Sequence, residues 1–491
     1  MRCLSLLMLF CSVTLTIFPN ASNAAPPWPE NPFVRKQVED ALPKTTSTWD
    51  GAAYARNGTR GASYAALGLL WRDGKHDRAM ATAILRELVK LQYDDELGDE
   101  KHGVWRTRFA ETKVDYNWRE FVGCSLILTL EEFGDRLPSD LKQEIRATLL
   151  RAAQGAKQRN VGADYTNIAI MSAFLMDYVG QHQRRDDLQA VGRKKAEDIF
   201  DRYYEHKTFD EYNSPTYYGV NLMALGMWRK HACWERMRAM GERMEADLWR
   251  DLGEFYHADM RNMCGPFVRA YGMDMTEYVA ITGIWIGMAL GDERLAPLPT
   301  GAGRKSGERS YSPVIAVLKP IVPSEVRPRL AEFSGGPRVL QRVCSRGTVT
   351  ARIDKDLMMG AVQLKRRWEQ HVPATVYWKA GSELGWIMLH GTTEHVAPAI
   401  VGQDLQIVRT QESKDPILLY IAAPAIDANQ VSGKTWNSPG LTLDAVFGEG
   451  IMLQSVEKVE HPWFGQCLEV KIQAPATSTL ILRPSCPGWA S

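Results

Sequence analysis

A three-residue pattern recurs in the N-terminal half of the chain at an interval that restricts the choice of fold. The pattern is an acidic residue, a tyrosine and a polar side chain of the kind that caps helices. It returns after 49 and then 47 residues: Asp115-Tyr116-Asn117, Asp164-Tyr165-Thr166 and Glu211-Tyr212-Asn213. Each copy precedes a strongly apolar segment with helical spacing, and each interval also holds a more charged helical segment. One apolar and one charged helix per repeat is what stacked or ring-closed helical hairpins require.

Helical spacing extends from about Phe33 to Gly291, because apolar residues recur there every three or four positions. The clearest segments are residues 79–91, 118–133, 141–153, 168–178, 220–228 and 278–290. They follow one another too closely for alternation with parallel strands, so their apolar faces must pack on one another. We therefore predict an (α/α) toroid over residues 25–297. Its apolar helices would form an inner ring, and charged helices such as 140–159 and 184–204 would form an outer ring.

The chain changes character after residue 297. Residues 298–336 open with a polar stretch rich in glycine and proline, which predicts a linker and the start of a β-domain. Residues 337–491 hold short β-rich segments separated by Gly, Pro, Asn and Asp turns: 339–343, 348–353, 374–378, 386–389, 405–409, 417–421, 441–446, 466–472 and 478–482. The predicted fold class is α+β and multidomain, with an N-terminal (α/α) toroid followed by a C-terminal antiparallel β-sandwich.

Residues 1–24 have the order of a secretory signal peptide. Met1-Arg2 precedes an apolar run that ends at Phe18, and small residues lead to a cleavage site near Ala24. The apolar run is short for a bilayer span, and prolines follow it immediately. We therefore expect a secreted or periplasmic protein without membrane insertion after signal cleavage.

Charge and cysteine usage narrow the choice of partner. Lys and Arg number 59 against 58 Asp and Glu, without a long block of one sign, which argues against a nucleic-acid partner. Six cysteines follow the signal peptide without CxxC spacing, and Cys467 with Cys486 is the one disulfide pair we consider. Neither an HExxH motif nor a close His/Asp/Glu set indicates a metal, so no cofactor is expected. The sequence does not define the oligomeric state.

Candidate site residues cluster near the expected N-terminal ends of the inner helices. Those ends would open onto one face, where unpaired backbone N–H groups and helix dipoles favour anions. An acidic polysaccharide is therefore the expected partner. Singly, each side chain has a structural explanation, such as helix capping or core packing. Together, at equivalent element ends, they indicate chemistry. The candidates are Asn117, Trp118, Asn167, Glu211, Asn213, Tyr217, Tyr218, His257, Arg269 and Tyr271.

Four segments resemble the toroid-plus-sandwich polysaccharide lyases. They are Asn117-Trp118, the loop 162–167, the run 209–222 with its Tyr-Gly pair, and the loop 265–272. The resemblance is to hyaluronan and chondroitin AC lyases and, more distantly, to heparinase II/III-like enzymes. It implies an aromatic sugar-binding patch at Asn117-Trp118, a carboxylate-neutralising Asn167, a catalytic Tyr218 and an arginine-bearing loop with Arg269.

This sequence departs from the pattern of those lyases at one point. Those lyases carry a histidine several residues before the catalytic tyrosine, whereas residues 209–215 contain none. Asn213 or the more distant His257 would have to supply that role, or the chemistry differs. A divergent family of the same architecture is the interpretation we favour.

The implied chemistry explains why these residue types belong together. A lyase removes the proton at C5 of a uronic acid and expels the 4-linked oxygen, so negative charge builds on the sugar carboxylate. Asn167 and Arg269 would stabilise that charge as an oxyanion hole does. Tyr218 would act as base and then as acid if neighbouring cations lower its pKa. Glu211, Asn213, Tyr217, His257 and Tyr271 would contact the substrate.

Two alternatives stay open from the sequence. A glycoside hydrolase of the same toroid type would use Glu211 and Asp274 as a pair of carboxylates across the glycosidic bond. A non-catalytic glycan-binding protein is permitted by the abundance of 15 Trp and 17 Tyr.

Overall fold

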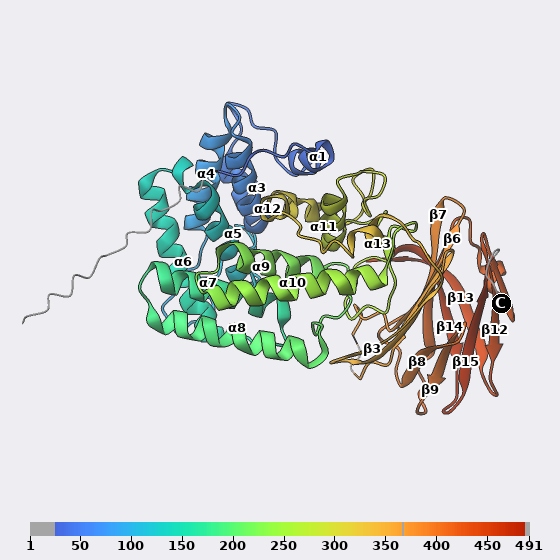
Figure 1. The fold of residues 1–491 in the computed structure, drawn as a ribbon. Helices are drawn as coiled ribbons and strands as arrows, with labels where there is room; N and C mark the ends of the chain where they lie inside the picture. The colour runs from blue at the N-terminus through green and yellow to red at the C-terminus, as the bar shows by residue number, and fades with distance from the viewer. Residues whose placement is uncertain (1–24, 366–367, 487–491) are drawn as a thin grey trace, which may run out of the picture.

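The structure is a computed structural model that describes residues 25–365 and 368–486. The expected signal peptide lies outside these residues. The helical domain and the β-domain lie side by side (Figure 1). The helices are α1 (Pro32–Asp40), α2 (Gly51–Asn57), α3 (Thr59–Arg72), α4 (Asp77–Lys90), α5 (Trp118–Phe133), α6 (Ser139–Arg159), α7 (Thr166–His182), α8 (Asp186–His206), α9 (Tyr217–His231), α10 (Glu235–Phe255), α11 (Ile281–Leu290), α12 (Ser312–Leu318) and α13 (Arg327–Ala331). Within the described residues, no helix is long and apolar enough to cross a membrane.

The long helices form two layers, as the sequence predicts. Helices α3, α5, α7 and α9 pack on one another in succession, and each pairs with an outer helix: α4, α6, α8 or α10. The inner helix α7 is buried on every side from Thr166 to Gly180, whereas the outer helix α8 buries one stripe that includes Leu188, Ala196 and Tyr203. An all-round apolar helix requires neighbours on all sides, which explains why the apolar segments became the inner layer.

The stretch 298–336 differs from the expected linker because it completes the helical ring. It holds the 3-10 helix η2 (Ser306–Tyr311), the fully buried helix α12, and α13. Helix α12 packs against both α3 and α9, so it joins the first and last of the long inner helices. A helix of two turns is too short to show a helical period, which is why this segment was not recognised.

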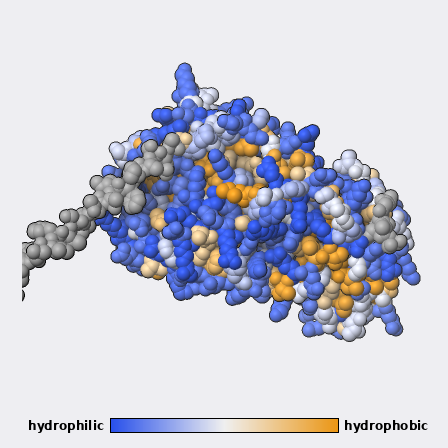
Figure 2. All heavy atoms as spheres, viewed as in Figure 1, coloured by the Kyte–Doolittle hydropathy of each residue, from blue (hydrophilic) through white to orange (hydrophobic). Residues whose placement is uncertain are grey.

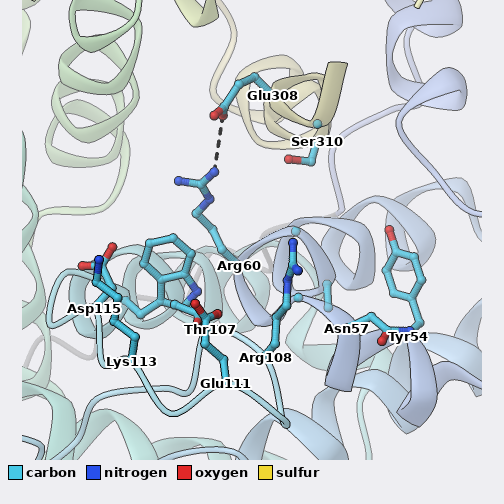
Figure 3. Close-up of a pocket in the computed structure, with 15 residues that line it drawn as sticks. Tyr54, Asn57, Arg60, Thr107, Arg108, Glu111, Lys113, Asp115, Glu308 and Ser310 are labelled. Atoms are coloured by element: carbon cyan, nitrogen blue, oxygen red, sulfur yellow. Dashed lines mark hydrogen bonds and ion pairs between the residues drawn. The ribbon is translucent and has the colours of Figure 1, made fainter. Parts of the chain in front are cut away.

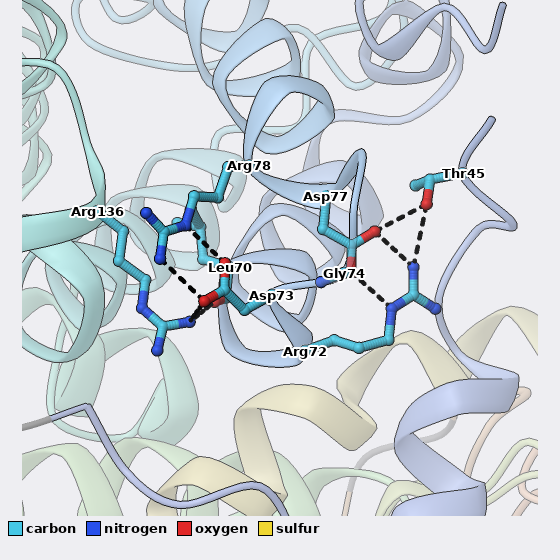
Figure 4. Close-up of polar contacts among 8 residues, drawn as sticks. All are labelled: Thr45, Leu70, Arg72, Asp73, Gly74, Asp77, Arg78 and Arg136. Carbon is cyan, nitrogen blue, oxygen red and sulfur yellow. Dashed lines mark hydrogen bonds and ion pairs between the residues drawn. The ribbon is translucent and has the colours of Figure 1, made fainter. Parts of the chain in front are cut away.

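Polar contacts fix the turn between α3 and α4 (Figure 4). Arg72 at the end of α3 donates two hydrogen bonds, of 2.7 and 2.8 Å, to the buried carboxylate of Asp77 at the start of α4. Asp73 between them has a left-handed backbone and accepts from Arg78 at 2.6 Å. A carboxylate at a helix N-terminus and a bidentate arginine partner are both stabilising.

The β-domain contains two antiparallel sheets, which confirms the predicted sandwich. One sheet has eight strands in the order β13-β14-β10-β7-β6-β5-β4-β3, and the other has five in the order β11-β12-β15-β9-β8. The strands are β3 (Arg338–Cys344), β4 (Gly347–Ile353), β5 (Leu357–Val362), β6 (Ala374–Ala380), β7 (Glu383–Leu389), β8 (Val396–Val401), β9 (Asp404–Arg409), β10 (Ile417–Ala422), β11 (Thr435–Ser438), β12 (Leu441–Phe447), β13 (Met452–His461), β14 (Gly465–Gln473) and β15 (Thr479–Ser485). The sequence prediction missed β5, β8, β11 and β13.

The eight-stranded sheet is covered on both faces. One face shares a core with the five-stranded sheet, to which Trp378, Leu389 and Leu482 belong. Its other face contributes Met358 and Tyr377 to the core of the helical domain. Strand β5 therefore has no exposed side chain, and it lacks the alternating pattern by which a half-buried strand is recognised.

On the face seen in Figure 2 the surface is mostly hydrophilic, but apolar side chains gather on the β-domain around β3, β8 and β9. Val339, Val343 and Val401 are at least half exposed there. The six cysteines of the described chain are free thiols, so the pairing of Cys467 with Cys486 is wrong.

Candidate active site

A cavity of about 330 Å³ opens where the inner helices begin. Helices α5, α7 and α9 start at Trp118, Thr166 and Tyr217, directly beside it. Its walls combine arginine, lysine, amide and tyrosine side chains from the helical domain. The lining residues are Arg60, Asp115, Asn117, Trp118, Phe121, Tyr165, Asn167, Thr216, Tyr217, Val220, Arg269, Tyr271, Val279, Ile281, Lys305, Glu308 and Tyr311. Six of the ten predicted site residues are among them: Asn117, Trp118, Asn167, Tyr217, Arg269 and Tyr271.

Arg269 has the most elaborate set of contacts in the cavity. Its guanidinium lies 4.2 Å from the ring centroid of Tyr217 and 4.6 Å from that of Trp368. It donates to Glu211 Oε1 at 3.1 Å and to Gln370 Oε1 at 2.7 Å. Stacking on two rings and two hydrogen bonds leave the guanidinium little freedom, so its charge is held in a fixed place.

Glu211 does not line the cavity; it forms an ion pair with Arg269, which does. Its carboxylate also accepts a hydrogen bond of 3.0 Å from Thr166, and the side chain is buried. Burial raises the pKa of Glu211, and the nearby Arg269 opposes that shift. The expectation that Glu211 contacts the substrate is therefore corrected: it orients the arginine.

The two asparagines of the cavity are oriented differently. Asn117 accepts from Arg159 at 2.9 Å and donates to the Tyr165 hydroxyl at 2.9 Å, so both ends of its amide are engaged. Asn167 accepts from the Ile168 backbone at 2.9 Å, and its Nδ2 makes no hydrogen bond with any described residue. Asn167 thus has a free N–H donor available for a ligand in the cavity.

The triplet pattern suggested that α5 and α7 each begin with a side-chain cap. In the structure, the N-cap residues of both helices make no side-chain capping hydrogen bond.

Tyr217 and Tyr271 form a pair of hydroxyls in the same cavity, 3.1 Å apart. The Lys305 ammonium lies 5.2 Å from the Tyr271 ring centroid, and Trp463 of the β-domain packs edge-on against that ring. Burial raises the pKa of Tyr217, and the positive charge of Arg269 opposes this shift. The Tyr217 hydroxyl therefore keeps its proton at neutral pH.

Tyr218 does not face the cavity, so its predicted placement is wrong. It is fully buried, and its hydroxyl donates to Asp251 Oδ2 at 2.8 Å and lies 3.0 Å from the Thr208 hydroxyl. Burial, with the negative Asp251 beside it, raises the pKa of Tyr218. Adjacent residues of a helix point about 100° apart, so only one of the two tyrosines can face the cleft.

Asn213 and His257 are structural, so neither replaces the missing histidine in the cavity. Asn213 has a left-handed backbone and donates to the carbonyls of Cys264 and Pro266 at 2.7 and 2.9 Å. His257 is buried against Phe333 and hydrogen-bonds the Asp354 carbonyl. Burial lowers the pKa of His257 to about 4.

Asp274, the second carboxylate of the hydrolase hypothesis, also lies outside the cavity. Its carboxylate accepts from the backbone and hydroxyl of Thr276, both at 2.7 Å. Since neither Glu211 nor Asp274 lines the cavity, they do not form a pair across a bound sugar.

A second, larger cavity of about 700 Å³ adjoins the first (Figure 3). The two share Arg60, Asp115, Trp118 and Glu308. The second cavity is bounded by the end of α2, the start of α3 and the loop 107–115. It also has basic side chains, Arg108 and Lys113.

The sequence analysis missed several residues around this cleft: Arg60, Lys305, Glu308, Trp368, Gln370 and Trp463. Arg60 lies in a helix without a motif, and Lys305 and Glu308 come from the stretch expected to be a linker. Trp368 and Gln370 come from a loop of the β-domain. Among the described residues, no group of three or more His, Cys, Asp or Glu side chains is placed to hold a metal ion.

The fold and this cleft define a two-domain protein in which a ring of helical hairpins adjoins an antiparallel β-sandwich and holds a polar, aromatic cavity at its mouth. The chain belongs to a family described as a domain of unknown function, DUF8769, whose model matches residues 44–320. No curated protein matches the sequence.

Solved structures similar to the chain include a heparinase III, with a TM-score of 0.44, 7% identity, and coverage of 90% of this chain and 79% of that chain. A heparan sulfate lyase, HepC from Pedobacter heparinus, has a TM-score of 0.36 and 11% identity, and covers 94% of this chain and 84% of its own. The likeness to heparinase-type proteins stated from the sequence is thus found again among solved structures.

Proposed function

We propose that the protein is a polysaccharide lyase that cleaves a uronic-acid-containing polymer by β-elimination. The observation that supports this most is the convergence of Arg269, the free amide donor of Asn167 and the Tyr217–Tyr271 hydroxyl pair in one cavity. A cation and an N–H donor suit a carboxylate on which negative charge builds, and preorganised donors are usually the largest contribution to such catalysis.

In this proposal Tyr217 takes the role that the sequence assigned to Tyr218. The Tyr271 oxygen takes the C5 proton while its own hydroxyl proton passes to Tyr217 across their 3.1 Å hydrogen bond, the bond from C4 to its oxygen breaks, and a double bond forms between C4 and C5. The phenol of Tyr217 returns a proton to the leaving oxygen, which agrees with its raised pKa. Arg269 and Asn167 bind the sugar carboxylate, and Trp118 offers a ring face for stacking.

We further propose that the mature protein is exported, on the basis of the signal-like residues 1–24. Expression of the full gene, fractionation of the cells and N-terminal sequencing of the recovered protein test this. A mature N-terminus near Ala25 in the periplasm or the medium supports export. An intact Met1 in the cytoplasm contradicts it.

The decisive test of the lyase is incubation with a panel of hyaluronan, chondroitin, alginate, glucuronan and heparan sulfate. The unsaturated product of β-elimination absorbs in the ultraviolet. Growth of that absorbance supports the proposal. New reducing ends without absorbance would identify a hydrolase, and binding without either product would identify a glycan-binding protein.

A further inference from the structure

Arg60 stands at the boundary between the two cavities of the cleft. It belongs to α3, and its guanidinium lies among three rings, 5.0 Å from the centroid of Trp118, 5.3 Å from Phe121 and 5.2 Å from Tyr311. Both cavities count it among their walls. A cation held against aromatic rings keeps a fixed position even where it is partly exposed.

The guanidinium has far more donors than partners. An arginine side chain carries five N–H donors. Within the described residues, the polar contact of Arg60 is with Glu308 Oε2 at 3.4 Å, at the long end of hydrogen-bond geometry. Figure 3 shows this contact crossing from α3 to the segment that carries Glu308 and Ser310. Most donors of Arg60 are thus open to a ligand.

The position of Glu308 allows a ligand to displace its carboxylate from Arg60. It lies in η2, directly after Gly307, around which there is open space, and about a quarter of its side chain is exposed. A long, partly exposed ion pair contributes little to stability. Arg108 and Lys113 also line the second cavity, together with the acidic side chains of Glu111 and Asp115.

We propose that Arg60 binds an anionic group of the sugar next to the reacting uronate, and that Glu308 occupies Arg60 in the empty cleft and is displaced by that group. The inference rests on the proposed function, because it places the neighbouring sugar in the second cavity. The anionic group is a carboxylate or a sulfate, and both have the oxygen geometry that a guanidinium binds in a bidentate manner. Arg60 and Glu308 thereby set the preference for polymers that carry charge on neighbouring sugars.

The test compares two single variants whose effects should have opposite signs. Arg60→Gln removes the binding cation, and we expect the Kd for an anionic tetrasaccharide to rise by about tenfold. Glu308→Gln removes the competing carboxylate, and we expect the Kd to fall by about two- to fivefold. The probes are tetrasaccharides of glucuronan, which carry a carboxylate on every sugar, and of chondroitin sulfate, in which the sugar next to the uronate carries sulfate instead. Calorimetry on the mature protein measures both. A larger Arg60→Gln effect with the sulfated probe identifies sulfate as the bound group.

The exposed pair Arg250–Glu325, with an Nε–Oε1 distance of 2.9 Å, supplies matched controls. Arg250→Gln removes the same positive charge as Arg60→Gln, and Glu325→Gln removes the same negative charge as Glu308→Gln. Because Arg250 lies in α10 and Glu325 lies just before α13, these two control variants should leave the Kd for both probes unchanged. If Arg60→Gln has no effect on either probe, or if Arg60→Gln and Glu308→Gln weaken binding equally, the proposal is wrong and the pair is structural. Failure of both probes to bind the parent protein overturns it as well.

The binding readout separates this inference from the lyase assignment. Unsaturated product that forms equally well with Arg60→Gln leaves the lyase standing and overturns the role of Arg60. Conversely, opposite shifts in Kd without any unsaturated product from the panel support the anionic subsite and refute the lyase.

Discussion

Two adjacent tyrosines should respond to the loss of a hydroxyl in opposite ways. In Tyr218→Phe, Asp251 loses the buried 2.8 Å hydrogen bond that it accepts. Hydrogen bonds to charged groups are worth about 1.5–3 kcal/mol, so the free energy of unfolding should fall by that amount at pH 8. With an unfolding entropy of about 2 cal/mol/K per residue, a cooperative unit of about 300 residues should lose about 2–5 °C in Tm. The cleft is untouched, so kcat should change little.

Tyr217→Phe should show the reverse pattern. Among the described residues, its hydroxyl hydrogen-bonds only to the Tyr271 hydroxyl, and phenylalanine keeps the ring that packs against the core, so the Tm should stay within about 1 °C. Loss of a proton-transfer group should lower kcat by about 10²- to 10⁴-fold.

Thermal unfolding and ultraviolet product formation, measured on both variants in the same buffer, check this pair of expectations. The reasoning is refuted if Tyr218→Phe abolishes turnover at an unchanged Tm while Tyr217→Phe remains active, because that outcome places the reacting hydroxyl on the opposite side of α9.

Three further predictions follow from single contacts. Arg269→Lys should lower kcat/KM by about 10²-fold, since an ammonium cannot keep the guanidinium's stacking and two-sided hydrogen bonding; steady-state kinetics with full activity would contradict this. Burial raises the pKa of Asp251 to about 6 from 3.8, so the unfolded chain releases this proton first and stability falls as pH rises from about 4 to about 6. Asp251→Asn should remove that loss, at most about 3 kcal/mol, and parallel denaturant curves for both proteins across this range would refute it. Gly360→Ala should lower the free energy of unfolding by about 1–3 kcal/mol, because the new Cβ would overlap the Gly265 carbonyl oxygen, whereas Gly336→Ala meets no atom and should be neutral.

The sequence predicted those elements in which apolar residues recur at regular intervals and are buried in the structure. The triplets at residues 115 and 164 located the starts of α5 and α7, and the switch to short apolar segments located the sandwich. The third triplet was less accurate. Asn213 has a left-handed backbone and α9 begins only at Tyr217, so Asn213 is not the cap of this helix.

The error at Tyr218 came from the resemblance of the Tyr-Gly pair to a lyase segment, which does not show how the helix presents that tyrosine. Which of two neighbouring tyrosines faces a cleft depends on where the helix starts, and boundaries are the least reliable part of a sequence-based prediction. The partners that hold Tyr218 inside, Asp251 and, through it, Arg342 of β3, come from distant segments, with an Arg342–Asp251 distance of 2.8 Å. Local sequence does not contain such long-range contacts. For the same reason the sequence did not reveal that Glu308 meets Arg60.

The contacts of Arg269 with Gln370 and Trp368 determine how far the chain can be trimmed. The family match ends at residue 320, which invites a recombinant product cut near α12. Such a product would keep the helices that surround the cavity but lose the two side chains that orient its arginine, and it would expose the apolar face on which the eight-stranded sheet rests. The smallest unit that preserves the arranged cleft is therefore the helical ring together with both sheets of the sandwich, which share one core, so quantitative work on the cleft requires the chain to run through β15.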